Sequence, residues 1–258
     1  MLKFVNLTKK KFTQISLSES CKAILLGSLL GDGSLKLYKP YKNARFWIRH
    51  SLSQQKYWEW KIHQLKEIKT EKSNQIPSGY SKQKKLLFQS AAKKQLTEIY
   101  EITYKKNRLQ IKRNWLNFLT PLSLAVWWLD DGSIIDSGRR GVLCTDGFSK
   151  KEHDILKRYL FVVWKIETHI GVLNRTYKGQ HKKYFRIYMS NTSLKKYLRI
   201  IMPYSPPYML YKYCLLYKDP ELQERWISEM IRGLPNCQKN QIQEIIRLRK
   251  MQLKNFRK

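Results

Sequence analysis

The sequence predicts an α+β protein made of two pseudo-symmetric halves, each with the element order αββαββα, followed by a helical C-terminal tail. Two observations lead to this prediction. An apolar segment that ends in Asp-Gly-Ser occurs twice, as AILLGSLLGDGS at 23–34 and as SLAVWWLDDGS at 123–133. The patterns that follow the two copies then repeat in the same order. We therefore expect halves at 1–117 and 118–218, and a tail at 219–258.

The first half opens with a capping-box pattern at 16–19 and continues as the apolar helix that ends near Asp32. Apolar and polar residues then alternate over 34–38 and 44–49. This period of two predicts antiparallel strands with one buried face and one basic, aromatic face. The remaining elements expected in this half are a helix at about 54–72, a basic strand at 84–90 and a helix at about 91–104.

The second half repeats this order. Thr120-Pro121 provides an N-cap and a proline at the first helical position, and 149–152 forms another capping box. Gly33 and Gly132 follow the two apolar helices, where a residue with positive φ often ends a helix. The other expected elements are a helix from 149 to about 165, strands at 133–136, 141–148, 169–176 and 182–190, a helix at 192–201, and one or two basic amphipathic helices after Asp219-Pro220.

The composition of the chain indicates a folded protein that binds a polyanion. Its 258 residues include 51 Lys and Arg against 19 Asp and Glu, which gives a formal net charge of +32. Both halves and the tail carry an excess of positive charge, so the partner that binds the folded chain is expected to be DNA, RNA or an acidic membrane surface. Hydrophobic residues at 42% exclude disorder, and no apolar run is long enough to span a membrane. The four cysteines form no C-x-x-C and the five histidines complete no zinc pattern, so we expect reduced thiols in the core.

One carboxylate ends each apolar helix, Asp32 in the first and Asp131 in the second. The small residues Gly27, Ser28 and Gly31 permit close approach of a partner helix, and side-by-side packing would bring the two carboxylates together. Such a pair favours hard divalent cations, which polarise a phosphodiester and activate water. A single Asp-Gly step more often only caps and turns. Two of them at equivalent places in a repeat favour a metal site.

These segments resemble the signature motifs of the LAGLIDADG homing endonucleases, in their single-chain form with two motifs. The segment LTPLSLAVWWLDDG at 119–132 is similar to the family's LTP-x-x-LA-x-W-x-x-DDG variant. The segment LCTDGFS at 143–149 resembles its strand-into-helix segment, and MLYK at 209–212 resembles its M-x-YK box. The matches extend over about residues 20–215. Leu30 is a departure, because many members have an acid there.

The resemblance implies a saddle whose two sheets lie in the DNA major groove, with the motif helices at the interface of the halves. It implies that Asp32 and Asp131 bind Mg²⁺, with Mn²⁺ as a substitute, and that Lys212 is the active-site lysine of the second half. Asp130 and Asp136 are expected either to support this site or to lie exposed.

The resemblance also implies a basic residue before the second motif. Arg108 fits best, with Lys106 and Lys112 as alternatives. An arginine is a departure from the family's lysine, because it stabilises phosphate charge but does not easily act as a base.

Outward-facing basic and aromatic residues of the strands are the candidates for DNA recognition, through base edges and phosphates. They are Lys36, Tyr38, Arg45, Trp47 and Arg49 in the first half, and Arg139, Arg140, Lys182, Tyr184, Arg186 and Tyr188 in the second. Trp127 and Trp128 are expected in the core instead.

We therefore expect a monomeric, intron-encoded endonuclease that acts on double-stranded DNA. It would make Mg²⁺-dependent double-strand breaks by phosphodiester hydrolysis at a long asymmetric target in the intronless allele. The alternative is a maturase that binds its host intron RNA and assists splicing, with or without cleavage. A basic structural protein, such as a ribosomal or chromatin component, would not need paired acids at repeated positions.

The expected location is an organelle, a chloroplast or mitochondrion, with a prokaryotic cytoplasm as the alternative. Residues 1–18 contain lysines but no acid, no arginine and no apolar core of a signal peptide. The richness in Lys, Tyr and Ile fits an AT-rich organellar gene. No membrane association is expected.

Overall fold

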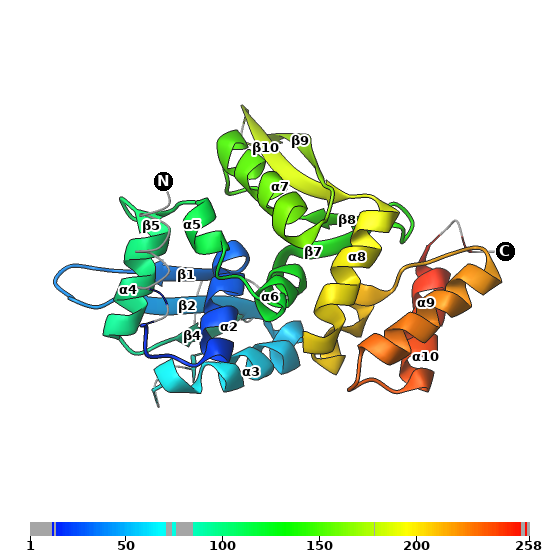
Figure 1. Cartoon of the computed structure of the whole chain (residues 1–258), viewed down its shortest axis with the longest axis horizontal. Helices are drawn as coiled ribbons and strands as arrows, with labels where there is room; N and C mark the ends of the chain where they lie inside the picture. Colours follow the sequence, from blue (N-terminus) through cyan, green and yellow to red (C-terminus); the bar gives the residue numbers. More distant parts are fainter. Residues whose placement is uncertain are drawn as a thin grey trace. The chain divides into compact units, whose positions relative to one another are not determined.

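The computed structural model describes residues 12, 14–70, 74–75, 85–177, 179–253 and 256. The chain divides into two compact units, residues 1–130 and 131–258 (Figure 1). The boundary falls at the end of helix α6 (Pro121–Asp131), because this helix packs on the first unit. The division at 117 and 218 expected from the sequence remains a prediction about the repeats.

The first unit is built on a four-stranded antiparallel sheet of order β1-β2-β4-β3. Its strands are β1 (Gly33–Lys36), β2 (Arg45–Ser51), β3 (Asn74–Gln75) and β4 (Lys85–Gln89), and the helices that pack on them are α2 (Glu19–Leu30), α3 (Gln55–Gln64) and α4 (Lys94–Thr103). In β2 the side chains of Phe46, Ile48 and His50 are buried, whereas those of Arg45 and Arg49 face outward. This confirms the two-faced strand that the alternation predicts.

Short elements fill the rest of the first unit. They are 3₁₀ turns at Leu52–Gln54 and Lys66–Ile68, a hairpin of β5 (Tyr104–Lys105) and β6 (Arg108–Leu109), and helix α5 (Arg113–Leu116). The helix expected over 54–72 is therefore shorter, because the chain tightens into a 3₁₀ turn after Leu65. The hairpin was not expected. Lys106 and Asn107 both have positive φ, the two-residue turn that joins twisted strands. Lys84, the start of the expected strand, lies outside the described residues.

The second unit repeats the topology with a four-stranded antiparallel sheet of order β7-β8-β10-β9. Its elements are β7 (Gly132–Ile135), β8 (Arg140–Leu143), α7 (Lys150–Trp164), β9 (His169–Tyr177), β10 (Gln180–Met189), α8 (Asn191–Ile201) and 3₁₀ turns at Met202–Tyr204 and Pro207–Tyr213. The capping box at Ser149 and Glu152 is present at the start of α7. With α6 as its first helix, this half has the same αββαββα order as the first, which confirms the predicted fold class.

Gly33 and Gly132 do not have the positive φ expected of them. Among the described residues, the glycines with positive φ are Gly138 and Gly179, both in turns between strands. The chain runs from each motif helix almost directly into a strand, so no left-handed cap is needed. Gly33 is required for space instead, because a Cβ there would lie 2.7 Å from the Cβ of Ser28.

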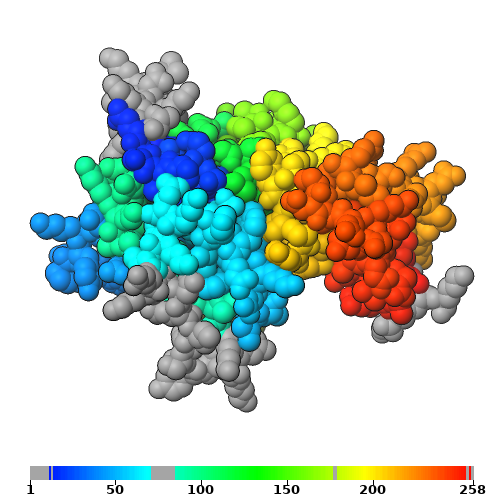
Figure 2. Space-filling view, turned by 90° about the horizontal axis from the view of Figure 1, so that it is seen from below, coloured from blue at the N-terminus to red at the C-terminus, as the bar shows by residue number. Residues whose placement is uncertain are grey.

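The tail forms helices α9 (Pro220–Gly233) and α10 (Lys239–Gln252), which pack side by side (Figures 1 and 2, orange to red). The buried Trp226 of α9 donates its indole N–H to the carbonyl of Tyr213 at 2.9 Å. Arg199 of α8 forms a bidentate pair with Glu229. The tail is therefore an integral part of the second unit. In the described part of the chain, every helix is too short or too polar to cross a membrane.

Candidate active site and nucleic-acid interface

The two motif helices, α2 and α6, approach each other at backbone distance. A Cβ on Gly27 would lie 2.4 Å from the carbonyl oxygen of Ser123, and a Cβ on Gly31 would lie 2.5 Å from the Cβ of Asp130. The side chains of Trp127 and Trp128 are fully buried. The small residues of α2 thus permit the close packing that the sequence predicts, and they bring the end of α2 next to Asp130.

Asp130 is a buried acid whose two carboxylate oxygens together accept four hydrogen bonds. Lys61 of α3 donates from Nζ to both carboxylate oxygens at 2.9 Å. Tyr57 donates its hydroxyl to Oδ1 at 2.7 Å, and the backbone N–H of Asp32 donates to Oδ2 at 3.3 Å. Both Lys61 and Asp130 have side chains with 0% exposure. Asp130 is therefore buried beside Asp32 and not exposed, and its expected role in supporting a metal site remains a prediction.

His50 lies between this ion pair and Asp32. Its Nε2 is 3.5 Å from Lys61 Nζ, and its Nδ1 is 3.2 Å from Gln54 Oε1 and 3.7 Å from Asp32 Oδ2. Burial, and then the charge of Lys61, lower the pKa of His50 from 6.5 to about 4, so the ring is neutral at pH 7. The carboxylate of Asp32 differs from that of Asp130, since 39% of its side chain is exposed.

Sequence reasoning missed Lys61, His50 and Tyr57. A signal exists for Lys61, because it lies on the same helix face as Tyr57, Ile62 and Leu65, where apolar residues are expected. A lysine in such a stripe indicates a buried cation with an acidic partner. The identity of that partner could not be read from the chain, since Asp130 is 69 residues away.

In the second unit, Lys212 lies beside the Asp-Gly step that ends α6. Its Nζ donates to the carbonyl oxygen of Gly132 at 2.6 Å. The N–H of Cys144 donates to the backbone carbonyl of Asp131 at 3.0 Å. Burial raises the pKa of the Cys144 thiol, and both Asp131 and Lys212 act on it electrostatically. The structure thus places Lys212 beside the Asp131-Gly132 step, and its role as the active-site lysine of the second half remains a prediction.

The remaining predicted residues near the motifs lie on turns. Asp136 is exposed in the β7–β8 turn, where its φ is +52°. Arg108 and its two alternatives, Lys106 and Lys112, are all exposed at the β5–β6 hairpin and the segment after it. This hairpin is tied to β1, because the N–H of Leu35 donates to the hydroxyl of Tyr104 at 3.1 Å. The assignment of Arg108 remains a prediction.

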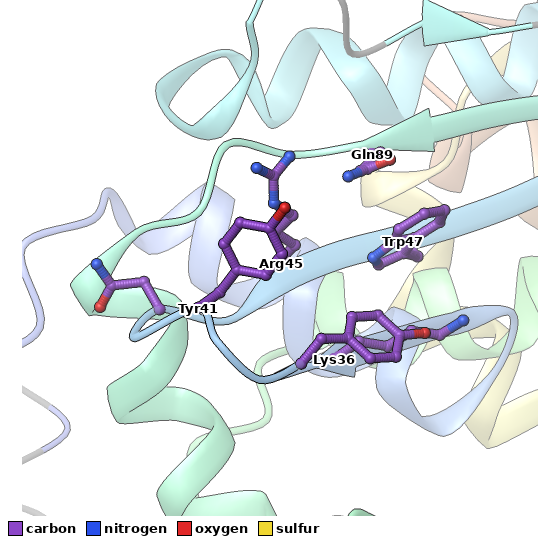
Figure 3. Close-up of a pocket in the computed structure, with 7 residues that line it drawn as sticks. Lys36, Tyr41, Arg45, Trp47 and Gln89 are labelled. Atoms are coloured by element: carbon purple, nitrogen blue, oxygen red, sulfur yellow. The ribbon is translucent and has the colours of Figure 1, made fainter.

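The outward face of the first sheet forms a basic, aromatic pocket (Figure 3). Lys36 Nζ lies 4.9 Å from the centre of the Trp47 ring, and the guanidinium of Arg45 lies 5.6 Å from the ring of Tyr41. These are cation–π pairs, in which a positive charge lies against the face of an aromatic ring. The pocket is lined by Lys36, Tyr38, Tyr41, Asn43, Arg45, Trp47 and Gln89. Gln89 was missed; the register pairs it with Trp47 across β2 and β4.

The outward face of the second sheet holds one acid that sequence reasoning did not select. Asp146 accepts two hydrogen bonds from Arg186, at 2.5 Å and 2.8 Å, and lies 3.6 Å from Arg175. Hydrogen bonding by Arg186 lowers the pKa of Asp146. Arg186 is thus a fixed side chain, whereas Arg139 and Lys182 are exposed. Two further candidates have partners in the same sheet: Arg140 Nη2 lies 3.3 Å from His169 Nε2, and the His169 ring stacks on Tyr188 with a centroid separation of 5.3 Å.

The four cysteines are free thiols, but Cys144 and Cys237 are only partly buried and do not lie in the core as expected. Cys21 and Cys214 are buried, and burial raises the pKa of each to about 12. At this pKa they remain protonated and serve only in packing.

Two αββαββα repeats, with an acid at or just after the end of each motif helix and basic residues on each sheet, define a class of α+β proteins with two repeated motifs. Residues 22–197 match the LAGLIDADG DNA endonuclease family, and the chain belongs to this family. The match confirms the resemblance noted in the motifs.

Relatives of this chain are between 26% and 29% identical to it over the aligned residues. RecA of Mycobacterium gastri is 29% identical over 212 residues, which cover 76% of this chain and 47% of that protein. The cytochrome b mRNA maturase bI2 of Debaryomyces hansenii is 28% identical over 196 residues, or 73% and 71% of the two chains. The probable intron-encoded endonuclease 1 of Wickerhamomyces canadensis is 28% identical over 216 residues, or 79% and 87%. The chain spans about half the length of the RecA relatives it matches.

A solved structure has the same fold. The homing endonuclease I-WcaI bound to its DNA recognition sequence superposes with a TM-score of 0.66 at 24% sequence identity. The superposition covers 82% of this chain and 92% of that one.

Proposed function

We propose that this protein is a site-specific, intron-encoded homing endonuclease that hydrolyses phosphodiester bonds in both strands of its DNA target. The observation that carries the proposal is the repeated Asp-Gly step. Asp32 lies just after α2, and its side chain is exposed. Asp131 is the last residue of α6, and Lys212 donates a hydrogen bond to the carbonyl oxygen of Gly132, the next residue. The family match and the DNA-bound I-WcaI structure support DNA as the substrate.

A carboxylate in each unit is a suitable ligand for a hard divalent cation. Asp32 and Asp131 offer carboxylate oxygens, the ligands that Mg²⁺ prefers, and Mn²⁺ accepts the same set. When bound, Mg²⁺ supplies charge that polarises the phosphodiester and activates water. Lys212 would add positive charge at the reacting phosphate, since its ammonium is held next to Gly132. Arg108 would do the same for the first half.

Binding of double-stranded DNA by a monomer would use the outward sheet faces. In the first unit, Lys36 and Arg45 would contact guanine edges or phosphates, and Gln89 would suit an adenine edge. In the second unit, Asp146 holds Arg186 in one orientation, which favours directional pairing with a base. The exposed Arg139 and Lys182 would contact phosphates and fix the register of the complex.

The test is cleavage of a plasmid that carries the intronless allele of the host gene, in Mg²⁺ buffer. Asp131→Asn should lower the cleavage rate at least about 100-fold while DNA affinity changes little, because the change removes a charge needed in the transition state. Lys212→Met should slow cleavage much more than binding. Asp136→Asn, in an exposed turn of the same unit, is the matched control. Full cleavage by Asp131→Asn or Asp32→Asn would refute the assignment.

A second candidate function is an intron maturase. It is favoured by the similarity to the cytochrome b mRNA maturase bI2, and the basic sheet faces would suit RNA phosphates as well. The test is splicing of the host intron by the purified protein. An increase in splicing rate at physiological salt by the Asp131→Asn variant would assign RNA binding to this chain independently of cleavage. The names of these relatives also favour an organelle as the location.

A further inference from the structure

A partly buried cluster in the first unit has the donors of a metal site and already contains a cation. One ligand atom from each of Asp32, His50 and Asp130 lies within 4.8 Å of the other two, the spacing of donors around a single ion. Two carboxylates and an imidazole suit transition metals such as Zn²⁺. The ammonium of Lys61 contacts this group, at 2.9 Å from both oxygens of Asp130 and 3.5 Å from His50 Nε2.

We infer that the Lys61 ammonium is the resident cation of this cluster, and that it keeps Asp130 and His50 from binding metal. The inference rests on the proposed function in one respect, that Asp32 and not Asp130 serves the catalytic cation. Lys61 is then a positioning residue. It acts through Asp130, whose Oδ2 holds the backbone N–H of Asp32.

The capacity of the Asp130 carboxylate supports this role. An ionised carboxylate has about four lone-pair sites. In Asp130, Oδ1 accepts from Lys61 and Tyr57, and Oδ2 accepts from Lys61 and Asp32. All four sites are therefore used, and a metal ion could bind Asp130 only by displacing Lys61.

Burial explains why the ammonium stays in place. Lys61 and Asp130 both have side chains with 0% exposure, so neither can move into water without opening the packing of α3 against α2 and α6. Removing one partner of such a pair leaves an uncompensated buried charge, which costs far more than the pair itself contributes. In Lys61→Met that charge is the Asp130 carboxylate, and a divalent cation would be its natural replacement.

The experiment measures Zn²⁺ binding by thermal unfolding of the full chain without DNA. Lys61→Met should bind Zn²⁺ at least about tenfold more tightly than the wild type, a change of the size seen when groups around a metal site are altered. Adding His50→Ala to Lys61→Met should remove the gain. Lys56→Met, an exposed lysine in the same helix, should match the wild type. Equal Zn²⁺ affinity in Lys61→Met and the wild type, or a gain that survives His50→Ala, would overturn the inference.

A second variant covers the case in which Lys61→Met does not fold. Lys61→Met/Asp130→Asn removes both charges and leaves none buried alone, so it should fold. Its Mn²⁺ affinity, measured by electron paramagnetic resonance, should stay within about threefold of the wild type, because Asp130 is not a ligand and the carbonyl oxygen of the asparagine can still accept from the backbone N–H of Asp32. A tenfold loss would overturn the inference. If the wild type itself binds no Mn²⁺, the proposed metal site fails, whereas the Zn²⁺ gain in Lys61→Met still reports on Lys61.

Discussion

Adjacent acids at the end of α6 have different surroundings because successive residues of a helix point about 100° apart. Asp130 faces α3 and the end of α2, and its carboxylate accepts hydrogen bonds from Lys61 and Tyr57. Asp131 points elsewhere, and its backbone carbonyl accepts from Cys144 in the second unit. One position along the helix thus separates a structural acid from the acid that we propose as a metal ligand.

His50 should make the stability of the first unit depend on pH. Its pKa is about 4 in the folded protein and near 6.5 in the unfolded chain, because burial and Lys61 disfavour the charged ring. Between these values the unfolded state binds a proton that the folded state does not. The stabilisation that the neutral His50 ring provides is therefore fully present above pH 6.5. As the pH falls toward 4, the free energy of unfolding decreases by up to about 1.4 kcal/mol per pH unit.

The measurement is urea unfolding at several pH values between 7 and 4.5. His50→Gln should flatten the part of the slope due to this residue. His63→Gln, at an exposed position of helix α3, which packs on the strand of His50, should retain the wild-type slope. A His50→Gln slope equal to that of the wild type would show that His50 is protonated in the folded state, contrary to this prediction.

At the scale of elements, the contact of α2 with α6 depends on residues without side chains. Gly27→Ala would place a methyl group 2.4 Å from the backbone carbonyl oxygen of Ser123, and a backbone atom cannot move aside as a flexible side chain can. We expect the free energy of unfolding to fall by about 1–3 kcal/mol, the usual cost of overpacking. Chemical denaturation measures it. Gly147→Ala, with no atom within 4 Å of the added Cβ, should cost little, and equal losses at both sites would contradict this account.

Most elements could be predicted because their signals are local. Alternation in β2 and the capping box at Ser149 both act within a few residues, and the structure confirms both. The internal repeat then predicted the same order of elements in both halves, which the structure confirms. The β5–β6 hairpin was missed, because its Lys106-Asn107 turn lacks the Asn-Gly signal and its strands have two residues each.

The site was predictable only in part, for a related reason. Asp32, Asp131 and Lys212 lie in motifs whose spacing can be read from the chain. The Lys61–Asp130 pair joins α3 to the end of α6, and no local sequence pattern in either segment identifies the partner residue in the other. The same holds for Arg186, because its pairing with Asp146 depends on how β10 lies beside the loop after β8. Tertiary proximity, not propensity, decides such contacts.

At the scale of the whole molecule, the net charge of +32 is spread over two folded units and not held in one arm. The first sheet presents Lys36 beside the ring of Trp47 and Arg45 beside the exposed ring of Tyr41. In the second unit, Asp146 neutralises part of the charge of Arg175 and Arg186. The charges that release counterions on binding should therefore be those on the sheet faces, and the tail should mainly stabilise the second unit.

Binding to random-sequence double-stranded DNA tests this distribution of charge. If the protein contacts about 6–10 phosphates, its affinity should fall about 10³- to 10⁵-fold between 50 and 200 mM salt. Arg45→Met should reduce the slope of log affinity against log salt by about one, because a phosphate contact is lost. Lys239→Met, at an exposed position of α10, should leave the slope unchanged. Fluorescence anisotropy at a series of KCl concentrations measures both slopes, and a larger change for Lys239→Met than for Arg45→Met would place the DNA-binding charge in the tail.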